Sequence, residues 1–418
     1  MSVKPPSSKS QNKVTAGNLA RLGAERLAEL LVGVAETRPD LKRRLRMELA
    51  AEEGPAPLAA QIDRRLGAFE TSRGQVTWRQ APAFLRDLDA LRLLMSERLA
   101  PLDRFAAVER LWRFMDAARQ LGSRYRDRGG ELEAVFGRAA ADLGALLCEV
   151  APGPAAVALT ESLTKNPSGW KAWLPALLAT APAELAREAL HDMSERRGAV
   201  PGWIALIRQL ALAAGDLDAL RASYTAQALT APAIAAELAG RFLDAGRFEE
   251  AGEILRAAAP RTEARASVQP DFDWESAWID YLERSGEAAA AQEVRWASFE
   301  RTLSIDRARA FVGRLGDFDD VEAEARVFEI AAGHANFEGG LGLLMAWPAL
   351  VDAAGMIERR SDEIEARPEA AELWAAKLRR RHPRAAHLLL RRAAAAAFRR
   401  RDFKACDRLT AEAETIAL

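Results

Sequence analysis

Short polar turns recur along the second half of the sequence at intervals close to the length of a helix pair. Gly215 and Gly246 lie 31 residues apart, and each is followed by a polar residue and then an apolar one. Glycine ends a helix in the left-handed conformation, the polar residue caps the next helix, and the apolar residue packs back into the hairpin. Related turns are at residues 285–287, 315–320 and, without glycine, 401–405. This rhythm predicts helix hairpins that stack in sequence order.

The composition also favours helices. Alanine, leucine, glutamate and arginine dominate the 418 residues, and all four are good helix formers. Tyrosine occurs 3 times, β-branched residues are sparse, and no run of alternating apolar and polar residues is bounded by hairpin turns. We therefore predict an all-α fold.

The Pro-Gly-Pro segment at residues 152–154 interrupts otherwise helical sequence and is the predicted domain boundary. Before it, residues 18–151 carry apolar stripes at helical spacing without a repeat period, which predicts an irregular N-terminal helical bundle. After it, residues 152–418 contain the recurring turns and predict a tetratricopeptide-like array. Residues 1–17 hold lysine, proline and serine but no hydrophobic stretch, so we expect a disordered lead.

Several segments resemble known proteins. Residues 245–251 are similar to the mid-hairpin turn of tetratricopeptide repeats. Residues 295–304 (RWASFERTLS) and 315–324 resemble a family of uncharacterised bacterial helical-repeat proteins, and residues 18–27 are similar to that family's N-terminus. The resemblance implies a helical-repeat fold over most of the chain and carries no established activity.

Motifs of catalysis and cofactor binding are missing from the sequence. There is no Gly-x-x-x-x-Gly-Lys-Ser/Thr phosphate loop and no Gly-x-Ser-x-Gly elbow. The glycines within residues 339–342 follow no strand pattern, so we expect a helix turn or close packing there. None of the 4 histidines has a cysteine or a second histidine at metal-ligand spacing. Glu188 and His191 form one Glu-x-x-His, but a di-iron bundle needs two such pairs and two more carboxylates. We expect no cofactor and no metal, and an unrecognised helical enzyme stays an alternative to a binding protein.

Charge, hydropathy and cysteine usage indicate the cellular location and limit the classes of partner. With a formal net charge of −1, nucleic-acid binding would need a local patch. No apolar segment approaches the ~20 residues that a membrane span needs. Cys148 and Cys406 lie far apart on apolar helical stretches, which fits two buried thiols in a reducing compartment. We expect a cytoplasmic protein without a membrane partner.

Arginine is concentrated near the C-terminus. Pro383 is predicted to begin a helix with an apolar face of alanine and leucine and arginine on the opposite face. Such a stripe binds an anion, an acidic protein surface or, as an alternative function, a nucleic acid. The competing interpretation is the solvated face of a terminal repeat. The candidate contacts are Arg384, Arg391, Arg392, Arg399 and Arg400.

Tryptophan pairs form the second candidate surface. Trp170 and Trp173 are three residues apart and Trp274 and Trp278 are four apart, so each pair shares a helix face. These rings either line a groove that grips a peptide or fill the core between repeats. The repeat rhythm without catalytic motifs predicts a non-enzymatic scaffold or adaptor that binds a partner protein's segment on a concave repeat surface.

Overall fold

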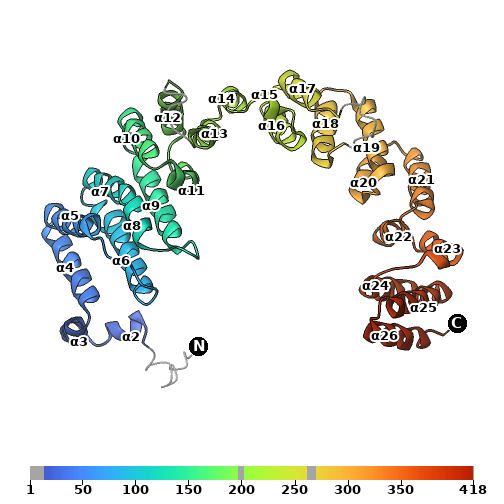
Figure 1. The fold of residues 1–418 in the computed structure, drawn as a ribbon, viewed down its shortest axis with the longest axis horizontal. Coiled ribbons are helices and arrows are strands. Elements are labelled where there is room, and N and C mark those ends of the chain that lie inside the picture. Colours follow the sequence, from blue (N-terminus) through green and yellow to red (C-terminus); the bar gives the residue numbers. More distant parts are fainter. Residues whose placement is uncertain (1–13, 196–201, 261–269, 418) are drawn as a thin grey trace, which may run out of the picture. The chain divides into compact units, whose positions relative to one another are not determined.

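The computed structural model describes residues 14–195, 202–260 and 270–417, and Figure 1 shows its helices in chain order. Every regular element in this described part is a helix, so the predicted all-α class is confirmed. The predicted lead, residues 1–17, lies mostly outside the described residues, and its last two residues open the first helix. The chain divides after Tyr224 into two compact units, which we call unit 1 and unit 2.

Unit 1 is a series of helices in which most elements pack on the next or the next but one. Helix α4 packs on α5, α5 on α7, α7 on α9, α9 on α11, and α11 on α13. Its elements are α2 (Ala16–Ala20), α3 (Ala24–Thr37), α4 (Pro39–Glu53), α5 (Pro55–Thr71), α6 (Ala81–Leu93), the π-helical turn η1 (Leu94–Leu99), α7 (Arg104–Asp116), α8 (Ala118–Arg124), α9 (Glu131–Leu147), α10 (Pro152–Lys165), α11 (Pro167–Leu178), α12 (Ala183–Glu195), α13 (Trp203–Ala214) and α14 (Leu217–Ala222).

Unit 2 continues the same pattern of local packing. Helix α16 packs on α17 and α18, α18 on α19, α21 on α22 and α23, and α25 on α24 and α26. Its elements are α15 (Ala226–Leu229), α16 (Pro232–Asp244), α17 (Phe248–Ala257), α18 (Phe272–Arg284), α19 (Ala288–Thr302), α20 (Ile305–Val312), α21 (Asp319–Gly333), α22 (Phe337–Ala346), α23 (Leu350–Arg359), the short 3₁₀ turn η2 (Ser361–Glu363), α24 (Pro368–Leu378), α25 (Pro383–Arg399) and α26 (Phe403–Glu414).

The predicted turns occur, with two variations. Gly215, Gly246 and Gly286 all have the left-handed backbone expected of a glycine after a helix, with φ between 70° and 85°. In residues 315–320 the left-handed residue is Phe318 (φ 79°) and not Gly316, and in residues 401–405 it is Arg401 (φ 62°). At Arg401 the hairpin chemistry is kept without glycine, because Asp402 then caps α26. Phe318 instead stands directly before α21, which has no side-chain cap.

The compact units do not divide at residues 152–154. Pro152 is instead the first residue of α10, where its missing N–H costs no helical hydrogen bond. Helices on either side of this segment pack tightly, because a Cβ on Gly144 of α9 would lie 2.3 Å from the carbonyl oxygen of Leu177 in α11. The sequence-based domain assignment therefore stays a prediction, and the contacts divide the chain at Tyr224.

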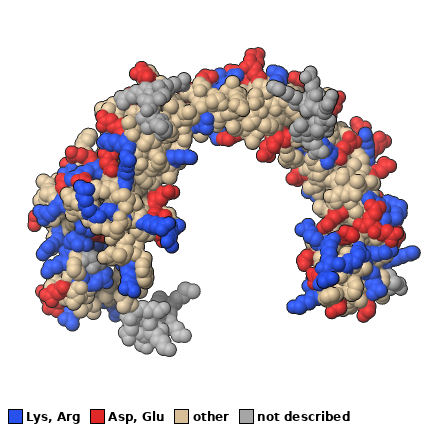
Figure 2. Space-filling model, in the orientation of Figure 1, with Lys and Arg blue, Asp and Glu red and all other residues tan. Residues whose placement is uncertain are grey.

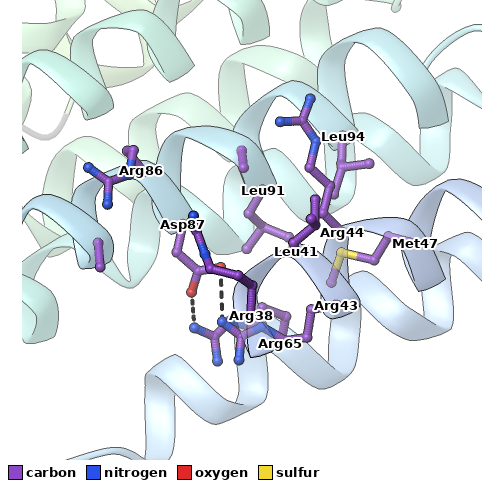
Figure 3. Close-up of a pocket in the computed structure, with 12 residues that line it drawn as sticks. Arg38, Leu41, Arg43, Arg44, Met47, Arg65, Arg86, Asp87, Leu91 and Leu94 are labelled. Atoms are coloured by element: carbon purple, nitrogen blue, oxygen red, sulfur yellow. Dashed lines mark hydrogen bonds and ion pairs between the residues drawn. The ribbon is translucent and has the colours of Figure 1, made fainter. Parts of the chain in front are cut away.

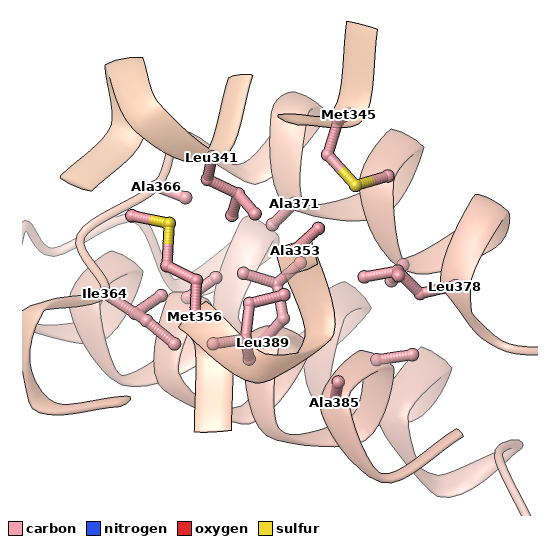
Figure 4. Close-up of a cluster of buried hydrophobic side chains, with 14 of the residues drawn as sticks. Leu341, Met345, Ala353, Met356, Ile364, Ala366, Ala371, Leu378, Ala385 and Leu389 are labelled. Carbon is pink, nitrogen blue, oxygen red and sulfur yellow. The ribbon is translucent and has the colours of Figure 1, made fainter. Parts of the chain in front are cut away.

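The core of unit 2 between α21 and α26 is built largely from leucine and small residues. Figure 4 shows Leu341, Met345, Met356 and Leu389 among alanines contributed by several helices. Alanine lets helix backbones approach closely, and the larger side chains fill the remaining volume at high density. The approach is closest at Gly340, where a Cβ would lie 2.0 Å from the carbonyl oxygen of Ala331. Close packing was one of the two roles expected for glycines 339–342.

The structure also bears on the predictions about membrane spans and about the two cysteines. None of the described helices combines the length and apolarity that crossing a membrane demands. Both cysteines are free thiols, but Cys148 is exposed and Cys406 is half-buried, so the expectation of two buried thiols is wrong. Cys148 follows the last turn of α9, where the chain leaves the apolar face of the helix.

We predict that Gly340→Ala destabilises unit 2 by about 1–3 kcal/mol, because its methyl group overlaps the Ala331 carbonyl. Gly342→Ala in the same helix is the matched control, since its added Cβ meets only a ring atom of Trp374 at 3.7 Å. Alanine should be neutral there or stabilise the helix by up to about 1 kcal/mol. Urea unfolding measures both values, and equal free energies of unfolding for the two variants would contradict the close approach.

Candidate functional site

A pocket lined by arginine lies between α4, α5 and α6 of unit 1 (Figure 3). Its volume is about 280 Å³, which suits a small polar group with part of its stem. We call it the arginine pocket, and its lining residues are Arg38, Leu41, Arg43, Arg44, Met47, Arg65, Ala83, Arg86, Asp87, Ala90, Leu91 and Leu94.

Helical spacing brings these side chains together. On α4, Arg43 and Met47 are four residues apart and therefore share a face. On α6, Asp87 and Leu91 share a face in the same way. Arg65 comes from α5, which packs along α4, and its guanidinium lies 4.2 Å from the centre of the Phe69 ring. Three helices thus contribute charged side chains around the apolar lining residues Leu41, Met47 and Leu91.

Positive charge exceeds negative charge in the arginine pocket. Asp87 is the single carboxylate among the lining residues, and Arg65 forms a close ion pair with it. Arg43 lies on the other carboxylate oxygen, with its Nη2 at 3.5 Å from Asp87 Oδ1. Figure 3 shows both arginines directed at this one aspartate. Besides Arg38, which has a further interaction, four arginines therefore line a pocket with one acidic side chain.

Several donors of these arginines are left without acceptors. The Nε atoms of Arg43 and Arg65 are buried and make no hydrogen bond. Arg44 and Arg86 are exposed, and neither forms an ion pair within residues 14–195, 202–260 and 270–417. A buried donor without an acceptor costs about 1–3 kcal/mol, so an anion that supplied acceptors here would be stabilised.

The chemistry available in the arginine pocket is recognition of an anion. Guanidinium groups present planar, paired N–H donors that match the oxygens of a carboxylate or a phosphate. Leu41, Met47 and Leu91 add an apolar surface beside those donors. The lining residues include no histidine, cysteine, serine or lysine to act as base or nucleophile.

The predicted C-terminal arginines all lie on or next to α25 and are exposed. Three of them pair with acids from the segment between α23 and α24: Arg392 Nη2 lies 2.6 Å from Asp362 Oδ1, and Arg399 and Arg400 lie 3.4 and 3.6 Å from Glu365. Arg384 and Arg391 have no ion-pair partner in the described part of the chain. Figure 2 shows basic and acidic side chains side by side over these last helices.

The predicted groove aromatics are mostly core residues. Trp170, Trp173 and Trp274 are 1%, 6% and 7% exposed, and only Trp278 is half-buried. The ring N–H of Trp170 donates to Ser162 Oγ at 3.0 Å, and that of Trp274 donates to the carbonyl of Leu255 at 3.0 Å. Since a groove wall must be exposed, the structure gives these rings the alternative role of packing between helices.

A buried polar network occupies the segment that carried the family resemblance. Glu275 of α18 accepts a hydrogen bond from Ser298 Oγ at 2.9 Å and forms a close ion pair with Arg301. Glu283 bridges Arg295 and Arg314, each at 2.5 Å. Burial opposes ionisation of Glu283, but hydrogen bonds from Arg314 and Arg295 outweigh it and hold its pKa below the ordinary 4.5. Both carboxylates are therefore fixed by arginines and link α18 to α19 and to the turn that follows α20.

The described residues contain no group of three or more histidine, cysteine, aspartate or glutamate side chains arranged to hold a metal. The arginine pocket was not predicted from the sequence. This pocket brings together more arginines than acidic side chains. Its signal was the basic run of Arg38, Lys42, Arg43, Arg44 and Arg46, which is typical of any solvated helix face.

We predict that stability is lost at acid pH through the lowered pKa of Glu283. A carboxylate whose pKa is lower in the folded protein stabilises it above the unfolded pKa, and this stabilisation is lost as pH falls through the folded pKa. Glu283→Gln should reduce the free energy of unfolding at pH 7 by about 1–3 kcal/mol, and its curve should converge with that of the unmodified protein below pH 4.5.

Glu293→Gln on the exposed face of α19 is the control and should follow the unmodified protein at every pH. Chemical unfolding between pH 3 and 8 makes the comparison. If the free energies of unfolding of Glu283→Gln and of the unmodified protein differed by the same amount at every pH, Glu283 would not contribute through its charge.

Comparison with known proteins gives a family match for this chain. Residues 9–201 and 184–417 match DUF6880, a family of unknown function. None of the curated proteins compared with the chain matches it. A solved structure described as a circular tandem repeat protein with novel repeat topology and enhanced subunit contact surfaces aligns with 94% of this chain and 96% of its own, at 16% identity and a TM-score of 0.19. That score is too low to support an argument from the likeness.

The two family matches together span nearly all of the sequence. They confirm the resemblance to an uncharacterised helical-repeat family that residues 18–27, 295–304 and 315–324 indicated. The chain belongs to the DUF6880 family.

Proposed function

We propose that this protein is a non-enzymatic interaction scaffold, and that unit 1 binds an acidic segment of a partner protein in the arginine pocket. One observation carries the proposal: besides Arg38, four arginines surround a pocket that holds one carboxylate, and two of their buried Nε donors have no acceptor. A bound acidic side chain would supply the missing oxygens.

The rest of the fold is compatible with a scaffold. Helices that pack on their chain neighbours keep their outer faces available, and such arrays commonly bind segments of other proteins. The apolar floor of the pocket, with Leu41, Met47 and Leu91, suits an apolar side chain next to the acidic one. The segment we expect therefore alternates acidic and apolar residues.

The alternative functions have weaker support. For nucleic-acid binding through the C-terminal stripe, Arg384 and Arg391 are the candidate cations without an ion-pair partner in the described chain. Phosphate backbones are bound through many cations at once. For a helical enzyme, the buried network offers Glu275 and Glu283, and arginines neutralise both. A cytoplasmic location, which two free thiols support, is part of the proposal.

We predict that a fluorescein-labelled synthetic peptide of alternating glutamate and leucine binds the full chain, and that the double variant Arg44→Glu with Arg86→Glu weakens binding by about tenfold or more. Both arginines are exposed and have no ion-pair partner among the described residues, so the variant should keep its helical circular dichroism. Fluorescence anisotropy measures the affinity, which should fall as salt concentration rises.

Arg64→Glu is the matched control, because Arg64 is exposed on α5 and does not line the arginine pocket. A peptide with glutamine in place of glutamate controls for apolar binding. An equal loss of affinity in Arg64→Glu, or equal affinity for the glutamine peptide, would show that binding is not a property of this pocket.

A further inference from the structure

An apolar face is left open on α3 of unit 1. Ala35 is the buried residue of this helix, whereas Leu30, Leu31 and Val34 are 42%, 43% and 48% exposed. Helix α25, by contrast, buries eight residues. The main packing partners of α3 are α2 and α4, so the side of α3 that neither covers keeps its apolar residues in solvent.

This face continues into a groove between α3 and α4. The groove has a volume of about 530 Å³, and Ala28, Leu31, Val32, Leu45 and Leu49 form its apolar lining. Leu49 is 67% exposed. Together with Leu30 and Val34 of α3 the groove forms an open apolar surface, a feature that usually marks a contact surface.

The charges that α4 places on the groove rim are separated along the helix, and α3 adds Glu36 to the rim. Lys42 and Arg46 lie in the first half of the helix, and Glu48 and Glu52 lie in the second half. Arg98 from η1 reaches Glu48 and Glu52 at 2.9 and 3.2 Å. Lys42 and Arg46 have no ion-pair partner in the part of the chain that the structure describes.

A surface with this charge order is complementary to itself under a two-fold axis. When two copies of α4 pair in opposite directions, the basic half of each faces the acidic half of the other. The residues that precede α2 offer no such match, because residues 1–15 contain only Met1, Val3 and Val14 as large apolar side chains.

We infer that the α3–α4 groove is the interface of an antiparallel homodimer, with Leu31 and Leu49 of each copy buried against the other. The inference goes beyond the arginine pocket and does not depend on it. The apolar residues supply the contact area. Lys42 and Arg46 set the antiparallel direction by facing Glu48 and Glu52 of the second copy, two acids that they share with that copy's Arg98.

The test is the molar mass of the full chain at micromolar concentration, measured by light scattering after size exclusion. We expect twice the mass of one chain, and Leu31→Asp and Leu49→Asp should each weaken self-association by at least about tenfold. Val321→Asp is the matched control, because Val321 is 67% exposed on α21, and it should leave the dimer intact. Circular dichroism confirms that each variant is folded.

Charge reversal tests the direction of the pairing. Lys42→Glu with Arg46→Glu, and separately Glu48→Lys with Glu52→Lys, should each give monomers because like charges then face each other. Mixing the two variants should restore a dimer. A chain that is monomeric throughout, or that binds a different protein while monomeric, would overturn the inference, as would a dimer that survives Leu31→Asp or mixed variants that stay apart.

Discussion

Burial of each helix against helices near it in sequence is the interaction on which the rest of this structure depends. Amphipathic helices of ten to seventeen residues are only marginally stable alone, so their neighbours supply most of the stabilisation. The backbones approach closely enough for this at small residues such as Gly144 and Gly340. Because each helix is covered only by helices near it in sequence, a helix that lacks such a neighbour keeps an apolar face exposed. Helix α3 has such a face.

Arginine is common throughout the chain. Its ion pairs distinguish the arginines that link helices from those that can bind a ligand. Most partly buried arginines meet acids from a neighbouring helix, as Arg110 does with Asp63 at 2.6 Å and Arg92 with Asp142 at 2.5 Å. These pairs link helices that are already adjacent. The arginine pocket differs because Asp87 is the single carboxylate among its lining residues. We therefore assign ligand binding to the pocket and packing to the other pairs.

Much of the fold follows from local sequence rules. Prolines at the first turn mark the start of α4, α5, α10 and α25, and the glycine turns at Gly215 and Gly246 end helices as expected. These signals act over a few residues, so a single sequence contains them. The same holds for the heptad-like stripe on α25, whose buried alanines and leucines lie opposite its arginines.

The candidate sites could not be predicted in the same way, because pairing between helices decides them. Arg392 finds its acid 30 positions away at Asp362, and Arg43 and Arg65 meet at Asp87 only when three helices pack. The tryptophans share helix faces as predicted, but sequence spacing does not tell a groove from a core. Cys148 is exposed because its helix ends there, a detail that no apolar pattern shows.

The central claim is that the arginine pocket holds positive charge in excess of what its own chain neutralises. A crystal of the full chain soaked with selenate tests it directly, since selenium scatters anomalously and selenate presents the oxygens of an acidic ligand. We predict an anomalous peak within hydrogen-bond distance of the Arg43 and Arg65 guanidinium groups, beside Asp87. An empty pocket whose arginines are all paired with acidic side chains of the same chain would contradict the account.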